Sequence, residues 1–369
     1  DSLDIDIYKK LYLDFAVSSE QPFDIRYIGV GESDRNAGTV LPDRLTIRGR
    51  IDQLPLEDWL TQYKALFPEK QGTTKLSDFP DMDIAISQLD WSTWPARDIH
   101  LTGNTADSAY NLKLESSRAN GVIVLPENRD NPVIVNMSSL TLPETGDDNA
   151  GQFDLNPGDL PPMTFSSKVL NNKYVRLKDV GFSIEPIQNG VQINSITFAA
   201  QDMIGLGHGS WTEVDTGKTE SAFEFNIESI DLEDTFEDLG FSGSIKKGDG
   251  YANLILHWEG APYDISAARL AGKGEVEIKK GSIKELDPGA GRLLALVNLN
   301  AITRRLSLDF KDVTNEGFTF DTIRGRIQLA EGGELTAKKV KIKSSAADIR
   351  ISGSTNIIDK TYNQTVSVV

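Results

Sequence analysis

The alternation of apolar and polar residues with a period of two restricts the fold of this chain more than any other feature. It is clearest in four segments: "RLTIRGRI" (44–51), "FEFNIESIDL" (223–232), "KKVKIK" (338–343) and "DIRISG" (348–353). It recurs in three shorter ones: "LSLDF" (306–310), "FTF" (318–320) and "RIQL" (326–329). Successive side chains of a strand point to opposite faces, so each segment is predicted to be a strand with one apolar face. Asn120-Gly121, Asn189-Gly190 and Gly332-Gly333 predict turns between strands.

The chain also repeats itself at a fixed distance. "DFPDMDI" (78–84) matches "DLPPMTF" (159–165), and "RDIHL" (97–101) matches "KDVGF" (178–182). Both pairs share one offset, which makes chance similarity a poor explanation. The basic-Asp-apolar motif returns at 311–313, and "IDQLPLEDWL" (51–60) resembles "IESIDLEDTF" (227–236). Repeats of this length predict a stack of units, each packed on its neighbours.

Helical periodicity is confined to three short segments, at about 56–67, 232–239 and 288–304. So few helices cannot cover so many one-sided strands. Either the sheet folds over as a closed sandwich, or it curves into a trough whose apolar floor holds an apolar ligand. The fold class is therefore predicted to be mainly β, an elongated and highly curved antiparallel sheet with a few short helices.

Composition excludes several classes of protein. The net charge is −17 and there is no basic cluster, which argues against nucleic-acid binding. The most apolar window, 293–302, is too short to cross a bilayer. The absence of cysteine excludes disulfides and is compatible with a bacterial periplasmic protein. The chain begins at Asp1 and ends within an alternating run, so we expect a piece of a longer protein.

No catalytic or metal-binding motif emerges. His100, His208 and His257 are far apart in the sequence, which favours exposed strand positions over metal ligands. "GDDNAG" (146–151) lacks the ligand spacing of a calcium loop. "GLGHG" (205–209) is not followed by a strand-turn-helix unit, so a bulge or a close approach is favoured over nucleotide binding. The prediction is a protein that is not an enzyme and has no metal or cofactor.

Two further motifs leave alternatives open. The repeated (Lys/Arg)-Asp-(Val/Ile) motif could contact phosphate, but a charge pair at a strand end that sets the register is favoured. The tryptophans could stack on sugars, although packing at the rims of the sheet is the commoner role. They are Trp59, Trp91, Trp94, Trp211 and Trp258.

Residues 270–369 resemble the C-terminal region of YhdP-type proteins, a group within the bacterial AsmA-like family. The most specific pieces are "PGAGRLL" (288–294), "RRLSLDFKDV" (304–313), "GFTFDTIRG" (317–325), "ADIRISGS" (347–354) and "TYNQTVSVV" (361–369). "LPLEDW" (54–59), "FPDMDIAI" (79–86), "RDIHL" (97–101) and "LHWEGAP" (256–262) resemble the preceding segments of the family more loosely.

The resemblance implies a repeating β-groove of the kind found in bridge-like lipid-transfer proteins. It implies that the full-length protein is anchored in the inner membrane of a Gram-negative bacterium and extends across the periplasm. The expected role is transport of phospholipid between inner and outer membrane along an apolar trough, without a chemical step. The resemblance also leaves room for a structural or assembly scaffold of the outer membrane that docks a periplasmic or outer-membrane protein. A carbohydrate-binding β-protein is the third alternative.

The candidate lipid-binding floor consists of apolar strand residues whose sequence neighbours are polar or charged. They are Val276, Ile278, Leu306, Leu308, Phe310, Phe318, Phe320, Ile327, Leu329, Val340, Ile342, Ile349 and Ile351. Helix 288–304 is predicted either to plug or cover the trough or to cap the core of one repeat, through Leu293, Leu294, Leu296 and Val297. The domains are predicted as two sets of groove repeats, 1–145 and 146–269, followed by the AsmA-like C-terminal region, 270–369.

Overall fold

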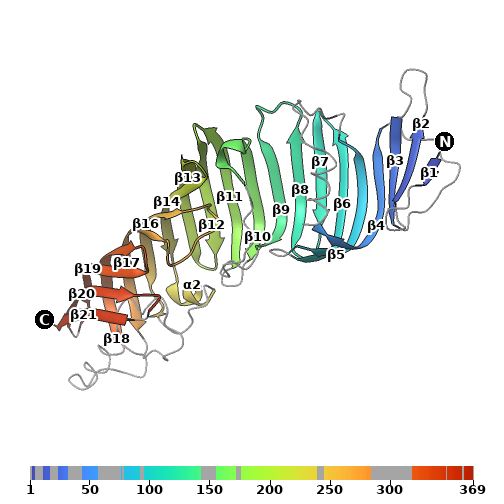
Figure 1. The fold of residues 1–369 in the computed structure, drawn as a ribbon. Helices are drawn as coiled ribbons and strands as arrows, with labels where there is room; N and C mark the ends of the chain where they lie inside the picture. Colours follow the sequence, from blue (N-terminus) through green and yellow to red (C-terminus); the bar gives the residue numbers. More distant parts are fainter. Residues whose placement is uncertain are drawn as a thin grey trace. The chain divides into compact units, whose positions relative to one another are not determined.

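The computed structural model describes residues 2–4, 11–16, 24–31, 44–56, 76, 79–91, 95–142, 155–171, 176–238, 245–283, 318–345, 347–359 and 361–368. The chain forms two compact units. Unit 1 contains residues 1–144, 148–152 and 161–170, and unit 2 contains the remainder. The strands can be followed along the chain in Figure 1.

Unit 1 is a sheet of successive strands. They are β1 (Ser2–Asp4), β2 (Leu11–Ala16), β3 (Asp24–Gly31), β4 (Thr46–Pro55), β5 (Asp81–Asp90), β6 (Ala96–Ala106), β7 (Ala109–Glu115), β8 (Ala119–Pro126), β9 (Val133–Thr141) and β10 (Met163–Asn171). Strand β4 pairs in parallel with both β3 and β5, whereas the other printed registers in unit 1 are antiparallel. The predicted antiparallel sheet therefore includes parallel pairing at β3–β5.

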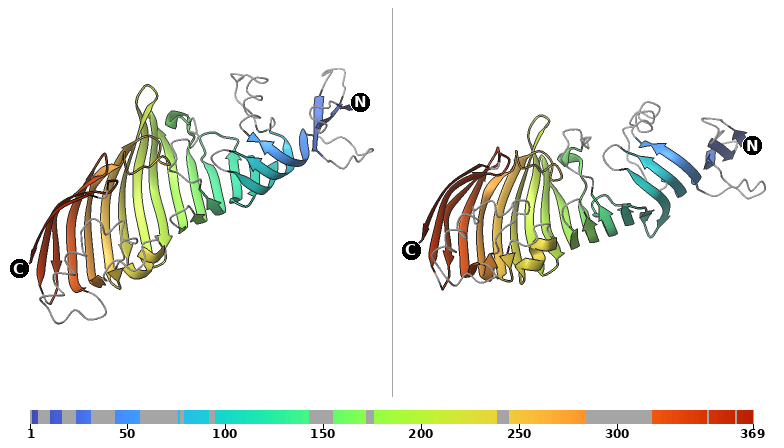
Figure 2. Two further views of the ribbon diagram at one scale, coloured as in Figure 1. Left: turned by 60° about the horizontal axis from the view of Figure 1, so that its bottom comes forward. Right: turned by 90° about the horizontal axis from the view of Figure 1, so that it is seen from below.

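Unit 2 is antiparallel in every printed register. Its strands are β11 (Arg176–Ile187), β12 (Gly190–Ala200), β13 (Met203–Asp215), β14 (Lys218–Ser229), β15 (Ile245–Lys246), β16 (Asp249–Glu259), β17 (Ala271–Ile283), β18 (Phe318–Ala330), β19 (Glu334–Lys343), β20 (Asp348–Asn356) and β21 (Thr361–Val368). Figure 2 shows that the strands from β16 to β20 curve along their length. The sheet does not close on itself, and the prediction of a mainly β fold with an open, curved sheet and few helices is confirmed.

Helical structure is sparse in the described residues. The predicted helix at 232–239 is present as α2 (Leu232–Asp238), and a short 3₁₀ turn, η2 (Pro157–Asp159), contacts β12 and β13. The predicted helix at 56–67 lies outside the described residues except for Leu56, and the predicted helix at 288–304 lies outside them completely.

Two of the three predicted turns are correct. Asn189 adopts a left-handed φ of 61° where β11 turns into β12, and Gly332 and Gly333 have φ values of 79° and 77° between β18 and β19. Asn120-Gly121 instead lies inside β8, so that prediction is wrong. The reason is local: the Asn120 amide donates to the Ser116 carbonyl oxygen and to Ser139 Oγ, which holds Asn120 in the strand.

The two described copies of the basic-Asp-apolar motif are kinks inside strands, not charge pairs at strand ends. Asp98 in β6 and Asp179 in β11 have φ values of 52° and 48°. The register between β11 and β12 shifts on either side of Gly181, next to Asp179. A bulge bends and twists its strand, so the motif marks a bend in β11, and Asp98 has the same left-handed conformation in β6. The third copy, at 311–313, lies outside the described residues. Aspartate suits the position since it tolerates the left-handed region better than most residues.

Candidate functional site

One face of the unit 2 sheet is apolar, and we call it the apolar face. Its clearest row crosses four strands through directly opposed residues: Ile278 of β17, Ile323 of β18, Ile342 of β19 and Ile349 of β20. Directly opposed residues in neighbouring strands point to the same side of a sheet. The row therefore forms a continuous aliphatic surface across the strands, and it ends on Val368 of β21, which is 51% exposed.

The register places all the described floor candidates on this apolar face. They are Val276, Ile278, Phe318, Phe320, Ile327, Leu329, Val340, Ile342, Ile349 and Ile351. The remaining candidates lie outside the described residues: Leu306, Leu308 and Phe310 of the floor, and Leu293, Leu294, Leu296 and Val297 of the predicted helix.

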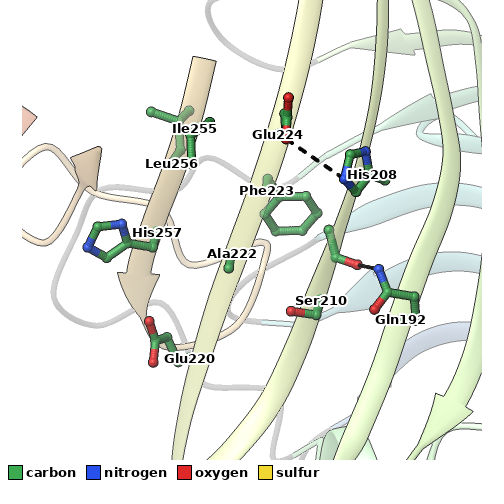
Figure 3. A pocket seen from close by; sticks show the side chains of 11 residues that line it. Gln192, His208, Ser210, Glu220, Ala222, Phe223, Glu224, Ile255, Leu256 and His257 are labelled. Atoms are coloured by element: carbon green, nitrogen blue, oxygen red, sulfur yellow. Dashed lines mark hydrogen bonds and ion pairs between the residues drawn. The ribbon is translucent and has the colours of Figure 1, made fainter. Parts of the chain in front are cut away.

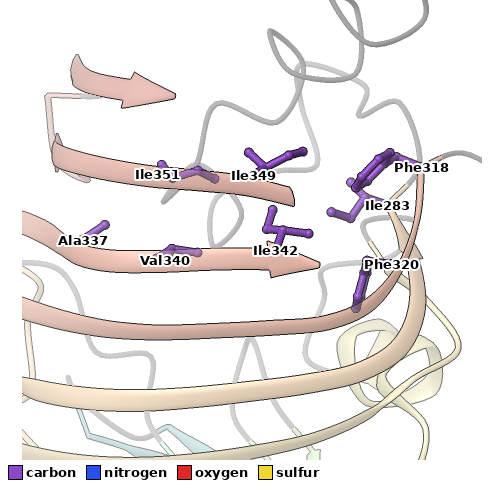
Figure 4. Close-up of a cluster of buried hydrophobic side chains, with 8 residues drawn as sticks. All are labelled: Ile283, Phe318, Phe320, Ala337, Val340, Ile342, Ile349 and Ile351. Carbon is purple, nitrogen blue, oxygen red and sulfur yellow. The ribbon is translucent and has the colours of Figure 1, made fainter. Parts of the chain in front are cut away.

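Burial divides these ten residues into two groups. Phe318, Phe320, Val340, Ile342, Ile349 and Ile351 are buried in one cluster with Ile283 and Ala337. Figure 4 shows this cluster, with Phe318 and Phe320 pointing into the bend of β18. Val276, Ile278, Ile327 and Leu329 are only half-buried. Six of the ten described floor candidates are therefore protein core, and the other four lie at a partly accessible surface.

The apolar face continues upstream as a ladder of aromatic rings. Phe223 of β14 stacks on Trp258 of β16 with ring centroids 5.4 Å apart and an interplanar angle of 16°. Phe223 also stacks on Phe225, at 5.8 Å and 8°, and Phe225 meets Phe198 of β12 edge to face at 6.1 Å. The alternation in "FEFNI" predicts this face, but residue spacing alone does not predict the stacking across strands.

Both ends of the strands that carry this ladder are covered. At one end α2 lies over the sheet: Leu232 is buried and packs directly above Gly250 of β16. Thr235 of α2 is hydrogen-bonded to Ser229 at 2.8 Å. At the other end the segment 260–270 follows β16, and Trp258 Nε1 donates to the Ala261 carbonyl oxygen at 2.9 Å. The apolar face of these strands is therefore bounded by α2 at one end and by segment 260–270 at the other.

The segment 260–270 is fastened to the sheet by a group of polar contacts. Ser221 Oγ donates to the Gly260 carbonyl oxygen at 2.8 Å, and Arg269 forms an ion pair with Asp264 at 2.7 Å. Tyr263 meets the edge of the buried Trp211 at 6.0 Å, and burial raises the pKa of its phenol. Trp211 and Trp258 are each 4% exposed, so these two tryptophans are buried and cannot stack on a sugar.

The opposite face of β17 and β18 is charged. Glu275 pairs with Arg326 at 2.7 Å and Glu277 with Arg324 at 2.8 Å, in each case directly across the two strands. The hydrogen bond from Arg324 lowers the pKa of Glu277 below its usual value. Since Glu275, Arg324 and Arg326 are largely exposed, we expect these pairs to contribute little to stability and mainly to favour this register and a hydrated face.

A shallow depression on the polar face of β12–β16 has a volume of about 480 Å³ and is shown in Figure 3. His208, Glu220, Glu224 and His257 line it, and His208 Nε2 lies 4.0 Å from Glu224 Oε2. Within the part of the chain that the structure describes, no three His, Asp or Glu side chains are placed to hold a metal ion.

The third histidine lies in unit 1. His100 Nε2 is 2.8 Å from Asp83 Oδ1, and its other ring nitrogen is 3.7 Å from Glu115, on an exposed surface of β5–β7. All three histidines therefore occupy exposed strand positions, as the sequence predicts. None of them lies on the apolar face of unit 2.

The "GLGHG" motif makes close approaches, as predicted. Gly205, Gly207 and Gly209 lie on the apolar face of β13, directly opposite Phe198, Phe225 and Phe223 respectively. The phenylalanine rings occupy the space that a side chain at each glycine would need.

These features define a class of protein. It is an open sheet with one apolar, partly accessible face and one charged face, bounded at the strand ends. The chain belongs to the YhdP family, whose model matches residues 1–369. It is 30% identical over 156 residues to the protein named intermembrane phospholipid transporter YhdP of Escherichia coli K12. That alignment covers 42% of this chain and 12% of the relative, so the chain corresponds to a small part of that protein.

No solved structure matches the chain. No helix among the described residues is long and apolar enough to span a membrane.

Proposed function

We propose that this chain is a periplasmic segment of a lipid conduit that shields the acyl chains of phospholipids during transport between the inner and outer membranes. The observation that carries the proposal is the half-buried part of the apolar face in unit 2, which includes Val276, Ile278, Ile327 and Leu329. The name of the Escherichia coli relative supports phospholipid as the ligand.

The energetics explain why such a surface is needed. A diacyl phospholipid carries roughly thirty methylene groups, and each costs about 0.8 kcal/mol to expose to water. Moving the tails through the periplasm unshielded would therefore cost on the order of 25 kcal/mol. An apolar sheet face contacts the tails along their length, while an open side leaves the head group in water. Such a surface needs no cofactor and performs no chemical step.

Aliphatic contacts also suit movement. Dispersion between methylenes and Ile or Leu side chains is weak for each pair of atoms and has little directional preference. A lipid can then slide along the floor without entering one deep minimum. The charged residues are kept on the opposite face by alternation, so the floor contains no fixed charge from β17 or β18.

A matched pair of substitutions on β18 tests the proposal. Ile327→Glu puts a charge on the apolar face, and Gln328→Glu puts the same charge on the opposite face one residue away. Binding of a fluorescent phospholipid to the 369-residue chain should be lost in Ile327→Glu and retained in Gln328→Glu. Circular dichroism confirms that both are folded. Equal binding by the two folded variants would contradict the proposal.

A structural or assembly scaffold is the second candidate, and the exposed apolar residues of β21 favour it. Strand β21 exposes Tyr362, Val366 and Val368, which lie on the apolar face by their register. Exposed apolar residues of this kind can contact a partner protein. A protein partner recovered by cross-linking at β21, from a chain that binds no lipid, would favour the scaffold.

A further inference from the structure

Strand β13 carries three glycines in alternating positions on the apolar face, in a pattern that no neighbouring strand repeats within the described part of unit 2. A Cβ at Gly205 would lie 2.1 Å from the ring of Phe198, one at Gly207 2.5 Å from Phe225, and one at Gly209 2.2 Å from Phe223. Real contacts to a Cβ are not this short. Each ring therefore lies directly over the backbone of β13, where any other residue would place a side chain.

The rings consequently take the place of β13 side chains on the apolar face, with Phe225 parallel to Phe223 and Phe198 edge to face with Phe225. Phe223 is buried, while Phe198 and Phe225 are half-buried and keep part of their surface accessible. Ile227 and Leu254 flank them on the same face and are also half-buried. The four residue steps of β14 from Phe223 to Ile227 span about 13 Å at about 3.3 Å per residue.

We propose that Phe198 and Phe225, laid over Gly205 and Gly207, are a binding platform for the acyl chains of a diacyl phospholipid, and that the glycines set its depth. This inference rests on the proposed function. It adds a section of the lipid-binding surface that lies outside the candidate residues at 276–351. The platform is continuous with that section, because the row through Phe225 runs over Leu254 and Gly274 to Ile327.

The chemistry of the platform selects an acyl chain over a polar ligand. The residues opposed to Phe225 on either side are Gly207 and Leu254, and neither offers a hydrogen-bonding side chain. The indole N–H of Trp258 donates to the Ala261 carbonyl oxygen, so it does not offer a hydrogen bond to a sugar hydroxyl. Ring faces and methylenes make favourable contacts without directional bonds, so a tail can shift along the platform.

The glycines also determine how closely an acyl chain can approach the rings, and substitutions at the glycines test this. A side chain at 207 cannot coexist with the present position of the Phe225 ring, since Phe225 Cδ1 lies 2.5 Å from the Cβ position; the Glu224 carbonyl oxygen lies 2.7 Å from it. The ring and the backbone of β14 must therefore both shift away from β13. Gly207→Val adds three carbons beneath the ring, and Ala222→Leu adds three carbons on the opposite face of the neighbouring strand β14.

Photocross-linking tests the platform directly. The photoreactive residue p-benzoylphenylalanine is placed at 225, at 226 on the opposite face and at the reference position 327. The 369-residue chain is irradiated with vesicles of phosphatidylethanolamine and phosphatidylglycerol, and mass spectrometry detects lipid adducts. We expect adducts at 225 and 327 and none at 226.

The outcomes separate the inference from the proposed function. An adduct at 327 with none at 225 would overturn the platform and leave the proposed function standing. Adducts at neither position would contradict the proposed function and the platform together. Equal adducts at 225 and 226 would overturn the platform, because the opposite face would then bind as well.

The glycine row is tested with the cross-linker at 198. Gly207→Val should lower the adduct yield at 198 by about tenfold, equivalent to about 1.4 kcal/mol of lost contact. Ala222→Leu should leave the yield unchanged, and Gly207→Val combined with Phe225→Ala should restore part of it. Gly207→Ala, with one added carbon, is the second variant, and circular dichroism identifies any chain that fails to fold. An unchanged yield in a folded Gly207→Ala or Gly207→Val chain would contradict the role of the glycines.

Discussion

The apolar face of unit 2 has two parts that differ in chemistry and in exposure. Across β17–β20 it is aliphatic apart from Phe318 and Phe320, and it contains a cluster in which Phe320, Ile349 and Ile351 are each 1% exposed. Across β12–β16 it is aromatic, built over a glycine strand, and half-buried at Phe198 and Phe225. The register shows that both parts belong to one face.

The difference shows that an apolar face is not uniformly a binding surface. The cluster of Phe318, Phe320, Val340, Ile342, Ile349 and Ile351 is protein core that holds the curved strands together. The section at 198–258 keeps part of its apolar surface accessible at Phe198, Phe225, Ile227 and Leu254. Alternation in the sequence predicts both parts, so burial, and not the pattern, distinguishes accessible floor from core.

The largest expected effect compares one phenylalanine from each part. Phe320→Ala removes a fully buried ring and should cost about 3–5 kcal/mol of unfolding free energy. Phe225→Ala removes a half-buried ring and should cost about 1–2 kcal/mol, because less apolar area returns to water. Urea unfolding of the two variants measures both values. Equal losses of unfolding free energy in the two variants would mean that both parts of the face are equally buried.

A smaller effect is expected at the bulge that bends β11. Asp179→Val places a β-branched residue at a φ of 48° and should destabilise the chain by about 1–2 kcal/mol. Asp179→Gly, the matched control, removes that steric cost and should be close to neutral. The midpoints of thermal or urea unfolding measure the difference in stability between the two variants. A valine variant as stable as the glycine variant would show that the left-handed bulge is not under steric constraint.

The smallest effect is expected on the charged face. The pKa of Glu277 is lowered in the folded chain by Arg324, so the pair stabilises the fold above the unfolded pKa of about 4.3. That contribution is lost as the pH falls through the lowered folded value. In Arg324→Gln, the free energy of unfolding should therefore differ slightly less between neutral and acidic pH than it does in the unsubstituted chain. High salt should reduce this difference in the unsubstituted chain as well.

The sequence predicts much of the fold through its alternation. The segments at 44–51, 223–232, 338–343 and 348–353 all fall largely within strands, and the described floor candidates share one face. "FTF" and "RIQL" prove to be the two ends of a single strand, β18, because Thr322 and Ile323 continue it through the intervening residues. The helix at 232–238 follows from its similarity to the helical pattern after residue 51.

Other features are beyond sequence patterns for physical reasons. Parallel and antiparallel strands with one apolar face have the same period, so the orientation of β4 depends on its long connections and not on its residues. The side-chain alternation reverses inside β17, where Val276 and Ile278 share a face with Gly281 and Ile283 across the left-handed Lys280. A simple period of two cannot anticipate such a reversal.

The ring platform could not be predicted for a similar reason. "GLGHG" indicates a close approach, but its partners Phe198, Phe223 and Phe225 lie on two other strands. Only the register brings the glycines and the rings together. The left-handed Ser195, at a φ of 51°, shifts the register of β12 and so decides which glycine Phe198 covers.

Native mass spectrometry of the chain, purified without added lipid, tests the central claim most directly. The account predicts bound species with the masses of diacyl phospholipids, which are absent from folded Ile327→Glu and present in Gln328→Glu. A folded, lipid-free chain that stays lipid-free when phospholipid vesicles are added would contradict it.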